Sequence, residues 1–180
     1  VQILKDLDEA ELDWPIEYSS PLLNVSRAKK CTAIALKTRV YLVQANYQKV
    51  IAESQKIVSS TAPFQYKEGT LTHKLESNFG TIFGGSYTGS EAVFSIPFAN
   101  STTETPSSQY ALAFNYLAQP ILFLTTAGIS SDPALNSSSD ARSSLISTNS
   151  AKQKVLRKFS ITTAPFRDYV PVIRYAEVLL

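Results

Sequence analysis

Aromatic residues beside amides, in stretches rich in Ser and Thr, are the residues of this sequence best suited to binding chemistry. A sugar binds where an aromatic ring stacks on its apolar C–H face and polar side chains bind its hydroxyl groups. The candidates for such contacts are Tyr87, Tyr110, Asn100, Gln109 and Asn115. Core packing is the commoner role for such a ring, and Phe98 and Tyr116 in the same region fit that role best. Ligand capture is the function that these residues favour.

Catalytic chemistry has little support in the sequence. His73 is the single histidine and stands in the polar stretch GTLTHKLES, so we expect an exposed loop side chain rather than a general base. No serine stands in a GxSxG nucleophile elbow. The carboxylates between Asp6 and Glu11 are expected to be solvated charges on a helix face rather than a glycosidase pair. The sequence predicts no catalytic residue and no enzyme activity.

Metal chemistry has one weak candidate. Asp132, Asn136 and Asp140 offer oxygen ligands of the kind that calcium prefers, four residues apart. This spacing matches no standard calcium loop, so we expect ordinary turns instead. Cys31 is the single cysteine, which excludes an intrachain disulfide and zinc-finger spacing, and it is expected to be a buried small apolar residue. We predict no metal and no cofactor.

The composition is that of a globular protein. The chain has 180 residues, 44% of them hydrophobic and 18% charged, with a net charge of +2. This length can bury the core of one domain. The 17 basic residues are scattered and form no stripe, so no nucleic-acid partner is expected. No apolar run approaches the ~18 residues of a membrane-spanning helix.

A helical hairpin is the clearest local structure. Residues 27–43 form an amphipathic helix that Ser26 could cap, and residues 47–58 form a second helix that Asn46 could cap. Because the connection is so short, the two helices must pack antiparallel. The other expected elements before residue 100 are a helix over 1–12, an extended connection over 13–23, loops and short helices over 60–90, and a strand over 92–98 ending at Pro97. After it we expect loops over 99–110 and 130–150, a helix over 112–127 interrupted at Pro120, and a strand or short helix over 152–161.

The last thirteen residues, DYVPVIRYAEVLL, predict a helix that starts at Pro171 and meets no stop signal. The segment is either a short helix docked in the core or part of a larger protein, and we favour the second explanation. On that explanation Leu179 and Leu180 are exposed by truncation and are not a binding surface.

The order of the segments AIALKTRVYLVQANYQKVIAESQKIV, SEAVFSIPF, SDPALNSSSDAR, RKF and DYVPVIRYAEVLL resembles the SusD/RagB family. These proteins are outer-membrane lipoproteins that capture nutrients in certain Gram-negative bacteria. The hairpin at 28–58 resembles a tetratricopeptide unit. Two departures are Val50 and Ser54, where the family often has Ala, and a DPR-like element that is split between 132–133 and 140–142.

The resemblance implies a mostly α-helical fold, with tetratricopeptide-like hairpins, a loop-rich region and a short strand element. Residues 1–180 would be part of a single SusD/RagB-like domain, with the hairpin 27–58 as scaffold, 60–150 on the ligand side and 171–180 as a truncated helix. The chain would be an internal fragment without the lipidated N-terminus, and Cys31, inside a helix, cannot carry the lipid.

The resemblance also implies a function. It predicts a surface-exposed outer-membrane lipoprotein that binds a glycan or another nutrient without catalysis, beside a TonB-dependent, SusC-like transporter. The alternative is a helical-repeat scaffold that binds a protein partner and no sugar.

Overall fold

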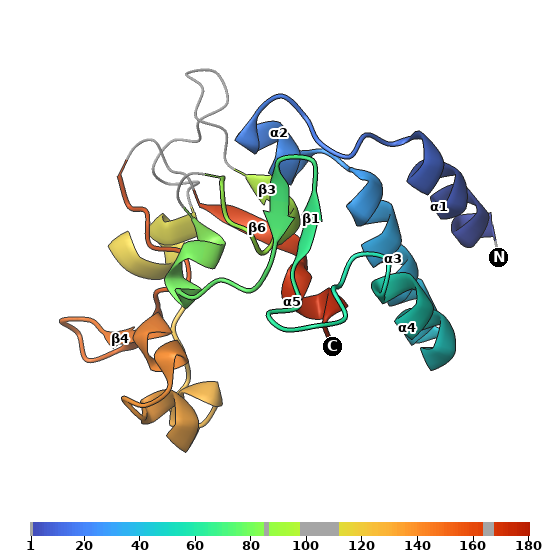
Figure 1. Ribbon diagram of the computed structural model, residues 1–180. Helices are drawn as coiled ribbons and strands as arrows, with labels where there is room; N and C mark the ends of the chain where they lie inside the picture. The colour runs from blue at the N-terminus through green and yellow to red at the C-terminus, as the bar shows by residue number, and fades with distance from the viewer. Residues whose placement is uncertain (1, 85–86, 98–111, 164–167) are drawn as a thin grey trace. The chain divides into compact units, whose positions relative to one another are not determined.

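The computed structural model describes residues 2–84, 87–97, 112–163 and 168–180 (Figure 1). The chain folds as two compact units, and each is made of segments distant in sequence. Unit 1 comprises Val1–Ser77, Tyr87–Ile96 and Pro171–Leu180, and unit 2 comprises Asn78–Ser86 and Pro97–Val170. Helical segments predominate and the strands are short, as expected. Within the described residues, no helix is both long and apolar enough to cross a membrane.

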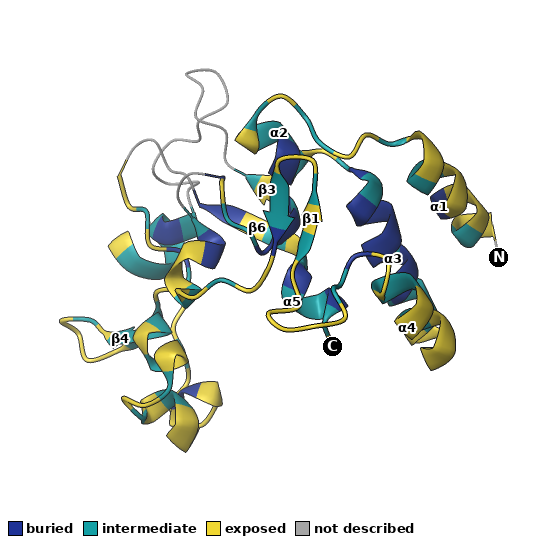
Figure 2. Ribbon diagram, viewed as in Figure 1, coloured by how far each residue is buried: buried dark blue, intermediate teal, exposed yellow. Residues whose placement is uncertain are grey.

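Four helices form the first part of unit 1: α1 Gln2–Asp13, α2 Pro21–Ser26, α3 Lys30–Val43 and α4 Tyr47–Ser54. Helix α3 packs against both α1 and α4, which confirms the predicted hairpin. The Asn46 side chain accepts a hydrogen bond from the Lys49 amide at 3.3 Å and caps α4, as predicted. Figure 2 shows α3 as a largely buried helix and α4 as largely exposed.

The start of the hairpin differs from the prediction. Ser26 is the last residue of α2 rather than a cap, and Lys29 occupies the N-cap position of α3. The expected extended connection contains the first turns of α2, because Ser20 caps this helix and Pro21 suits its first position.

Short strands complete unit 1. Strands β1 Tyr66–Glu68 and β2 Leu71–His73 form an antiparallel hairpin in which Tyr66 faces His73. Strand β3 Ala92–Pro97, predicted over 92–98, pairs with β6 Tyr169–Arg174, which continues into the short helix α5 Tyr175–Val178.

The predicted helix start at Pro171 is wrong. Pro171 lies inside strand β6, and only Tyr175–Val178 is helical. Two local effects explain the strand: a residue that precedes proline avoids the helical conformation, and the β-branched residues Val170, Val172 and Ile173 favour extended structure.

The core of unit 1 joins these elements. Its buried members are Cys31, Ile34, Ala35, Ile57, Val93, Ile173, Tyr175 and Val178. The burial of Cys31 confirms its predicted role. The Tyr175 hydroxyl lies 2.9 Å from the Ile57 carbonyl and 2.8 Å from the Phe64 carbonyl. The C-terminal segment therefore docks in the core through Val178, while Leu180 is fully exposed.

The described residues of unit 2 form short helical turns and a hairpin. Its elements are η1 Phe79–Phe83, η3 Phe114–Ala118, η4 Ile129–Ser131, η5 Pro133–Asn136, η6 Ala141–Leu145, β4 Ile146–Thr148 and β5 Lys154–Leu156. The helix predicted over 112–127 is reduced to one α-helical and π-helical segment that ends before Pro120. The sequence predicted either a strand or a short helix over 152–161. Strand β5 lies in this region and pairs antiparallel with β4, so the strand alternative is confirmed. Aromatic side chains of Phe79, Phe83, Tyr116 and Phe159 pack in its core.

Candidate ligand-binding cavity

Unit 1 contains a cavity of about 430 Å³ beside α2 and β2. Pockets for small ligands typically measure ~300–1,000 Å³. Three segments line it: 18–25 around the start of α2, 70–73 on β2, and 87–92 before and into β3. Lys29, at the N-terminus of α3, lies between these segments on the cavity wall.

Backbone and side-chain hydrogen bonds hold the α2 wall in place. The Tyr18 amide donates to Asn24 Oδ1 at 2.7 Å, and Asn24 Nδ2 donates back to the Tyr18 carbonyl at 3.2 Å. The Tyr18 hydroxyl donates to the Ala28 carbonyl at 2.9 Å. This wall is therefore fixed before any ligand arrives.

The β1–β2 turn is attached to the same region by Glu17. The Thr70 amide and hydroxyl both donate to Glu17 Oε2 at 2.8 Å, and these bonds lower the pKa of Glu17. Gly69 has a φ of +60°, and a Cβ there would lie 2.7 Å from Glu17 Oε2. The positive φ favours glycine, and a side chain at this position would also have to displace the Glu17 carboxylate.

Lys29 is a buried cation. Its side chain is fully enclosed, and Nζ donates to the Asn24 carbonyl at 2.7 Å. Burial lowers the pKa of Lys29, and the negative charge of Glu68 opposes this effect through space. Among the described residues, no carboxylate oxygen lies within 4.0 Å of Lys29 Nζ.

The expectation of an exposed His73 is wrong. The side chain is 5% exposed, in strand β2, and its ring stacks on Tyr175 with 6.1 Å between centroids. Nδ1 lies 3.3 Å from the Ser90 carbonyl, and Nε2 lies 3.7 Å from Cys31 Sγ. Burial, with a smaller effect of Lys29, lowers the pKa of His73 to about 4. The ring is therefore neutral at physiological pH and joins the cavity wall to the core.

The predicted ligand residues are only partly described. Tyr87 lines the cavity, is 9% exposed and has a φ of 59°. Asn115 lies in the π-helical turn η3 of unit 2 and is half-buried. Tyr110, Asn100, Gln109 and Phe98 lie outside the described residues. Tyr116 packs against Phe159 at 6.0 Å, as its predicted core role requires.

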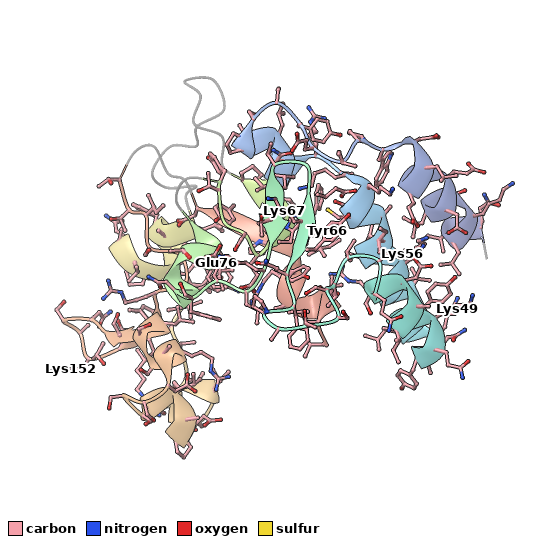
Figure 3. All side chains as sticks on the ribbon, viewed as in Figure 1. Lys49, Lys56, Tyr66, Lys67, Glu76 and Lys152 are labelled. Atoms are coloured by element: carbon pink, nitrogen blue, oxygen red, sulfur yellow. The ribbon has the colours of Figure 1, made fainter. Side chains whose placement is uncertain are left out.

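An ion cluster around the buried Lys37 joins α1 to the α3–α4 hairpin. Of the α1 carboxylates expected to be solvated, Asp8 is exposed, whereas Glu11 is partly buried in this cluster. Lys37 Nζ lies 2.9 Å from Asp8 Oδ1 and 3.0 Å from Glu53 Oε2, and it also contacts Glu11. Lys56, labelled in Figure 3, lies 3.1 Å from Glu11 and 2.9 Å from Glu53. Burial opposes the charge of Lys37, but its three carboxylate partners raise its pKa above the ordinary value. The sequence signal for this cluster is a lysine inside the apolar run AIALKT.

The calcium candidates form turns, as expected. The Asp132 side chain accepts from the Ala134 amide at 2.8 Å, and the Asp140 side chain accepts from the Arg142 amide at 2.9 Å. Asn136 Nδ2 donates to the Asp132 carbonyl at 2.8 Å, so its amide also serves the turn. The described residues contain no group of three or more His, Cys, Asp or Glu side chains that could hold a metal ion.

The sequence matches no family model and no curated protein at a significant level. Among solved structures, it matches a SusD superfamily protein from Bacteroides fragilis with a TM-score of 0.71 and 27% sequence identity. The match covers 99% of this chain and 37% of the length of that protein. The chain is therefore SusD-like, in agreement with the order of its sequence motifs.

Proposed function

We propose that this protein binds a nutrient glycan at the surface of the outer membrane. The observation that carries this proposal is the match to a SusD superfamily protein over 99% of the chain. Proteins of this family are binding proteins, and the proposed role is non-catalytic. The lipidated N-terminus that would anchor the protein is part of this proposal.

The proposed protein partner is a SusC-like, TonB-dependent transporter of the outer membrane. The helical side, with the α3–α4 hairpin Lys30–Val43 and Tyr47–Ser54, would serve as scaffold and contact the transporter. The proposal includes a tetratricopeptide-like character of this hairpin, which its antiparallel packing supports. The loop-rich region 60–150 would face the glycan.

The cavity of unit 1, which is lined by residues 70–73 and 87–92 of that region together with residues 18–29, supports ligand capture. Two of its residues, Tyr18 and Tyr87, carry aromatic rings, while Ser19, Thr72 and Thr88 carry hydroxyl groups. This combination suits a sugar, which needs an apolar surface for its C–H face and polar groups for its hydroxyls. The further residues proposed to contact ligand are Tyr110, Asn100, Gln109 and Asn115.

Calorimetric titration of the intact protein with a panel of neutral and acidic oligosaccharides tests this function. We expect binding heat with at least one glycan, and loss of that heat in Tyr87→Ala and in Tyr110→Ala. Tyr47→Ala is the matched control, because Tyr47 is 63% exposed on α4 and does not line the cavity. Thermal unfolding of each variant separates lost binding from lost folding. Absence of heat with every glycan would contradict the proposal.

The alternative function is a scaffold for a protein partner. Its support is a groove of about 360 Å³ between α3, α4 and α5, with the half-exposed apolar side chains of Leu42, Tyr47 and Ile51 along it. A protein that binds no glycan but loses a partner in Ile51→Asp would favour this alternative.

A further inference from the structure

The cavity of unit 1 has an unusual balance of charge. Its lining is rich in hydroxyl groups, and among the described residues that line it, Lys29 is the only lysine, arginine, aspartate or glutamate. Aspartate and glutamate, the side chains that commonly bind neutral sugars and cations, are missing from this described lining. His73 is neutral, because burial holds its pKa at about 4. Lys29 is therefore the one basic side chain of the described lining, and Glu68 acts on it only through space.

Lys29 and Lys37 are both buried lysines, but they differ in their carboxylate partners. Both side chains are 1% exposed. Lys37 Nζ has three carboxylate partners, from Asp8, Glu11 and Glu53. Lys29 Nζ has only a neutral carbonyl, that of Asn24, among the described residues. A buried ammonium group has three hydrogens to donate and is strongly destabilised without a negative partner.

We propose that the cavity binds the carboxylate group of an acidic sugar, with the Lys29 ammonium group as its counter-ion. This inference rests on the proposed glycan-binding function and specifies its ligand class. A carboxylate at Lys29 would supply the partner that Lys37 finds within the chain. The cavity volume of about 430 Å³ admits a small ligand, and the hydroxyl groups of Ser19 and Thr72 offer donors and acceptors for the sugar hydroxyls.

The geometry favours a sugar acid over a simple anion. The cavity is much larger than a free carboxylate ion needs, and the rings of Tyr18 and Tyr87 border it. A pyranose ring can fill this space and contact an aromatic surface, while its carboxylate contacts Lys29. Acetate carries the same charge but leaves that surface unused, so it should bind more weakly.

The test is a calorimetric titration of the intact protein with D-galacturonate, D-galactose and acetate. We expect galacturonate to bind at least about tenfold more tightly than either of the others, because only it uses both the charge and the ring. Lys29→Met, which removes the charge and keeps the length, should weaken galacturonate by about tenfold or more. Lys67→Met is the matched control, since Lys67, labelled in Figure 3, is exposed on β1 and does not line the cavity.

A second variant tests the same cavity independently, in case Lys29→Met does not fold. Thr72→Trp places a large ring at a half-buried position of the wall and should block galacturonate without changing the charge. Equal affinity for galactose and galacturonate, equal affinity for acetate, or unchanged binding in folded Lys29→Met would each overturn the inference. If neutral oligosaccharides bind while galacturonate does not, the inference fails and the glycan-binding function stands. If no glycan binds, both fail.

Discussion

The ion pairs of unit 1 and the capping side chains of unit 2 join residues at different separations along the chain. In unit 1, side chains join residues far apart in sequence: Arg39 Nε lies 2.7 Å from Glu177 Oε1, and Arg174 Nε lies 2.8 Å from Glu91 Oε1. In unit 2, the polar side chains that cap its turns bond within two residues, as Asp132 does with the Ala134 amide. These ion pairs of unit 1 can form only when the chain is folded. In these turns of unit 2, by contrast, the capping side chain bonds to a backbone amide of the same turn.

This difference has an energetic consequence. Removal of one member of a buried ion network leaves its partner charged and desolvated, which costs several kcal/mol. Loss of an exposed cap leaves a backbone amide that water can solvate, at a much smaller cost. Loss of a charge from the ion network of unit 1 should therefore lower stability much more than loss of a cap in unit 2. The four predictions below run from the largest expected effect to the smallest.

The largest effect is expected for Lys37→Met. The substitution leaves Glu11 and Glu53, whose side chains are 16% and 13% exposed, with Lys56 as their remaining cation. The free energy of unfolding should fall by about 3–5 kcal/mol, measured by urea denaturation of the intact protein. The control is Lys5→Met, because Lys5 is 72% exposed and lies 4.0 Å from Glu9. It should change stability by less than about 0.5 kcal/mol. Similar losses in both variants would remove the distinction between buried and exposed charges.

The second prediction concerns the dependence of stability on pH. Acid should destabilise unit 1 through His73 and stabilise unit 2 through Asp168. His73 in unit 1 has a pKa of about 4, below its ordinary value of 6.5. The unfolded chain binds the proton more readily, so stability from this group is present above pH 6.5 and is lost as the pH falls toward 4. Asp168 in unit 2 is buried, and burial raises its pKa from 3.8 to about 6. The folded chain binds this proton more readily, so this contribution grows as the pH falls from 6 toward 3.8.

Each of these two contributions is at most about 3–3.5 kcal/mol, since one pKa unit corresponds to ~1.4 kcal/mol. Hydrogen exchange, followed by mass spectrometry for segments of each unit between pH 4 and 7, measures them separately. His73→Gln should reduce the loss of stability that unit 1 shows as the pH falls. Asp168→Asn should reduce the gain of stability that unit 2 shows over the same range. An unchanged pH dependence in either variant would show that another group is responsible.

A smaller effect is expected for Tyr175→Phe in unit 1. The substitution keeps the ring and removes the hydroxyl that lies 2.9 Å from the Ile57 carbonyl and 2.8 Å from the Phe64 carbonyl. Because Tyr175 is 1% exposed, water cannot replace the lost donor, and stability should fall by about 1–2 kcal/mol in urea denaturation. Tyr47→Phe, at an exposed site, should leave stability unchanged.

The smallest effect is expected for Asp132→Ala in unit 2. This carboxylate accepts from the Ala134 amide at 2.8 Å and caps the turn η5. Since the residue is exposed, water can solvate the amide, and the loss should be about 1 kcal/mol or less. A loss as large as that of Lys37→Met would mean that the turns of unit 2 are not locally stabilised.

The same contrast in range explains which features the sequence could predict. The α3–α4 hairpin, its Asn46 cap and strand β3 depend on neighbouring residues, so local patterns are sufficient to identify them. The turns at Asp132 and Asp140 were predictable for the same reason. The order of the motifs along the chain identified the SusD-like fold, which no single element could do.

The errors arose where distant partners decide the structure. Pro171 could begin a helix, but β6 pairs with β3, a segment some seventy residues earlier in the chain, and that pairing fixes an extended backbone. His73 stands among polar neighbours in the sequence, yet its ring is enclosed by Tyr175 and Cys31. The cavity itself combines three separate segments with Lys29, and no local pattern indicates that they meet.

Gly69 has a consequence for natural and laboratory variation of this region. Glu17 covers the glycine, and a Cβ at position 69 would lie 2.7 Å from the carboxylate that holds Thr70. Position 69 and position 17 are therefore linked: a side chain at 69 would be strained by the positive φ, and it would also displace the Glu17 carboxylate from Thr70, which lines the cavity. Homologues that change this pair should differ in ligand preference even where every residue in the wall of the cavity is identical.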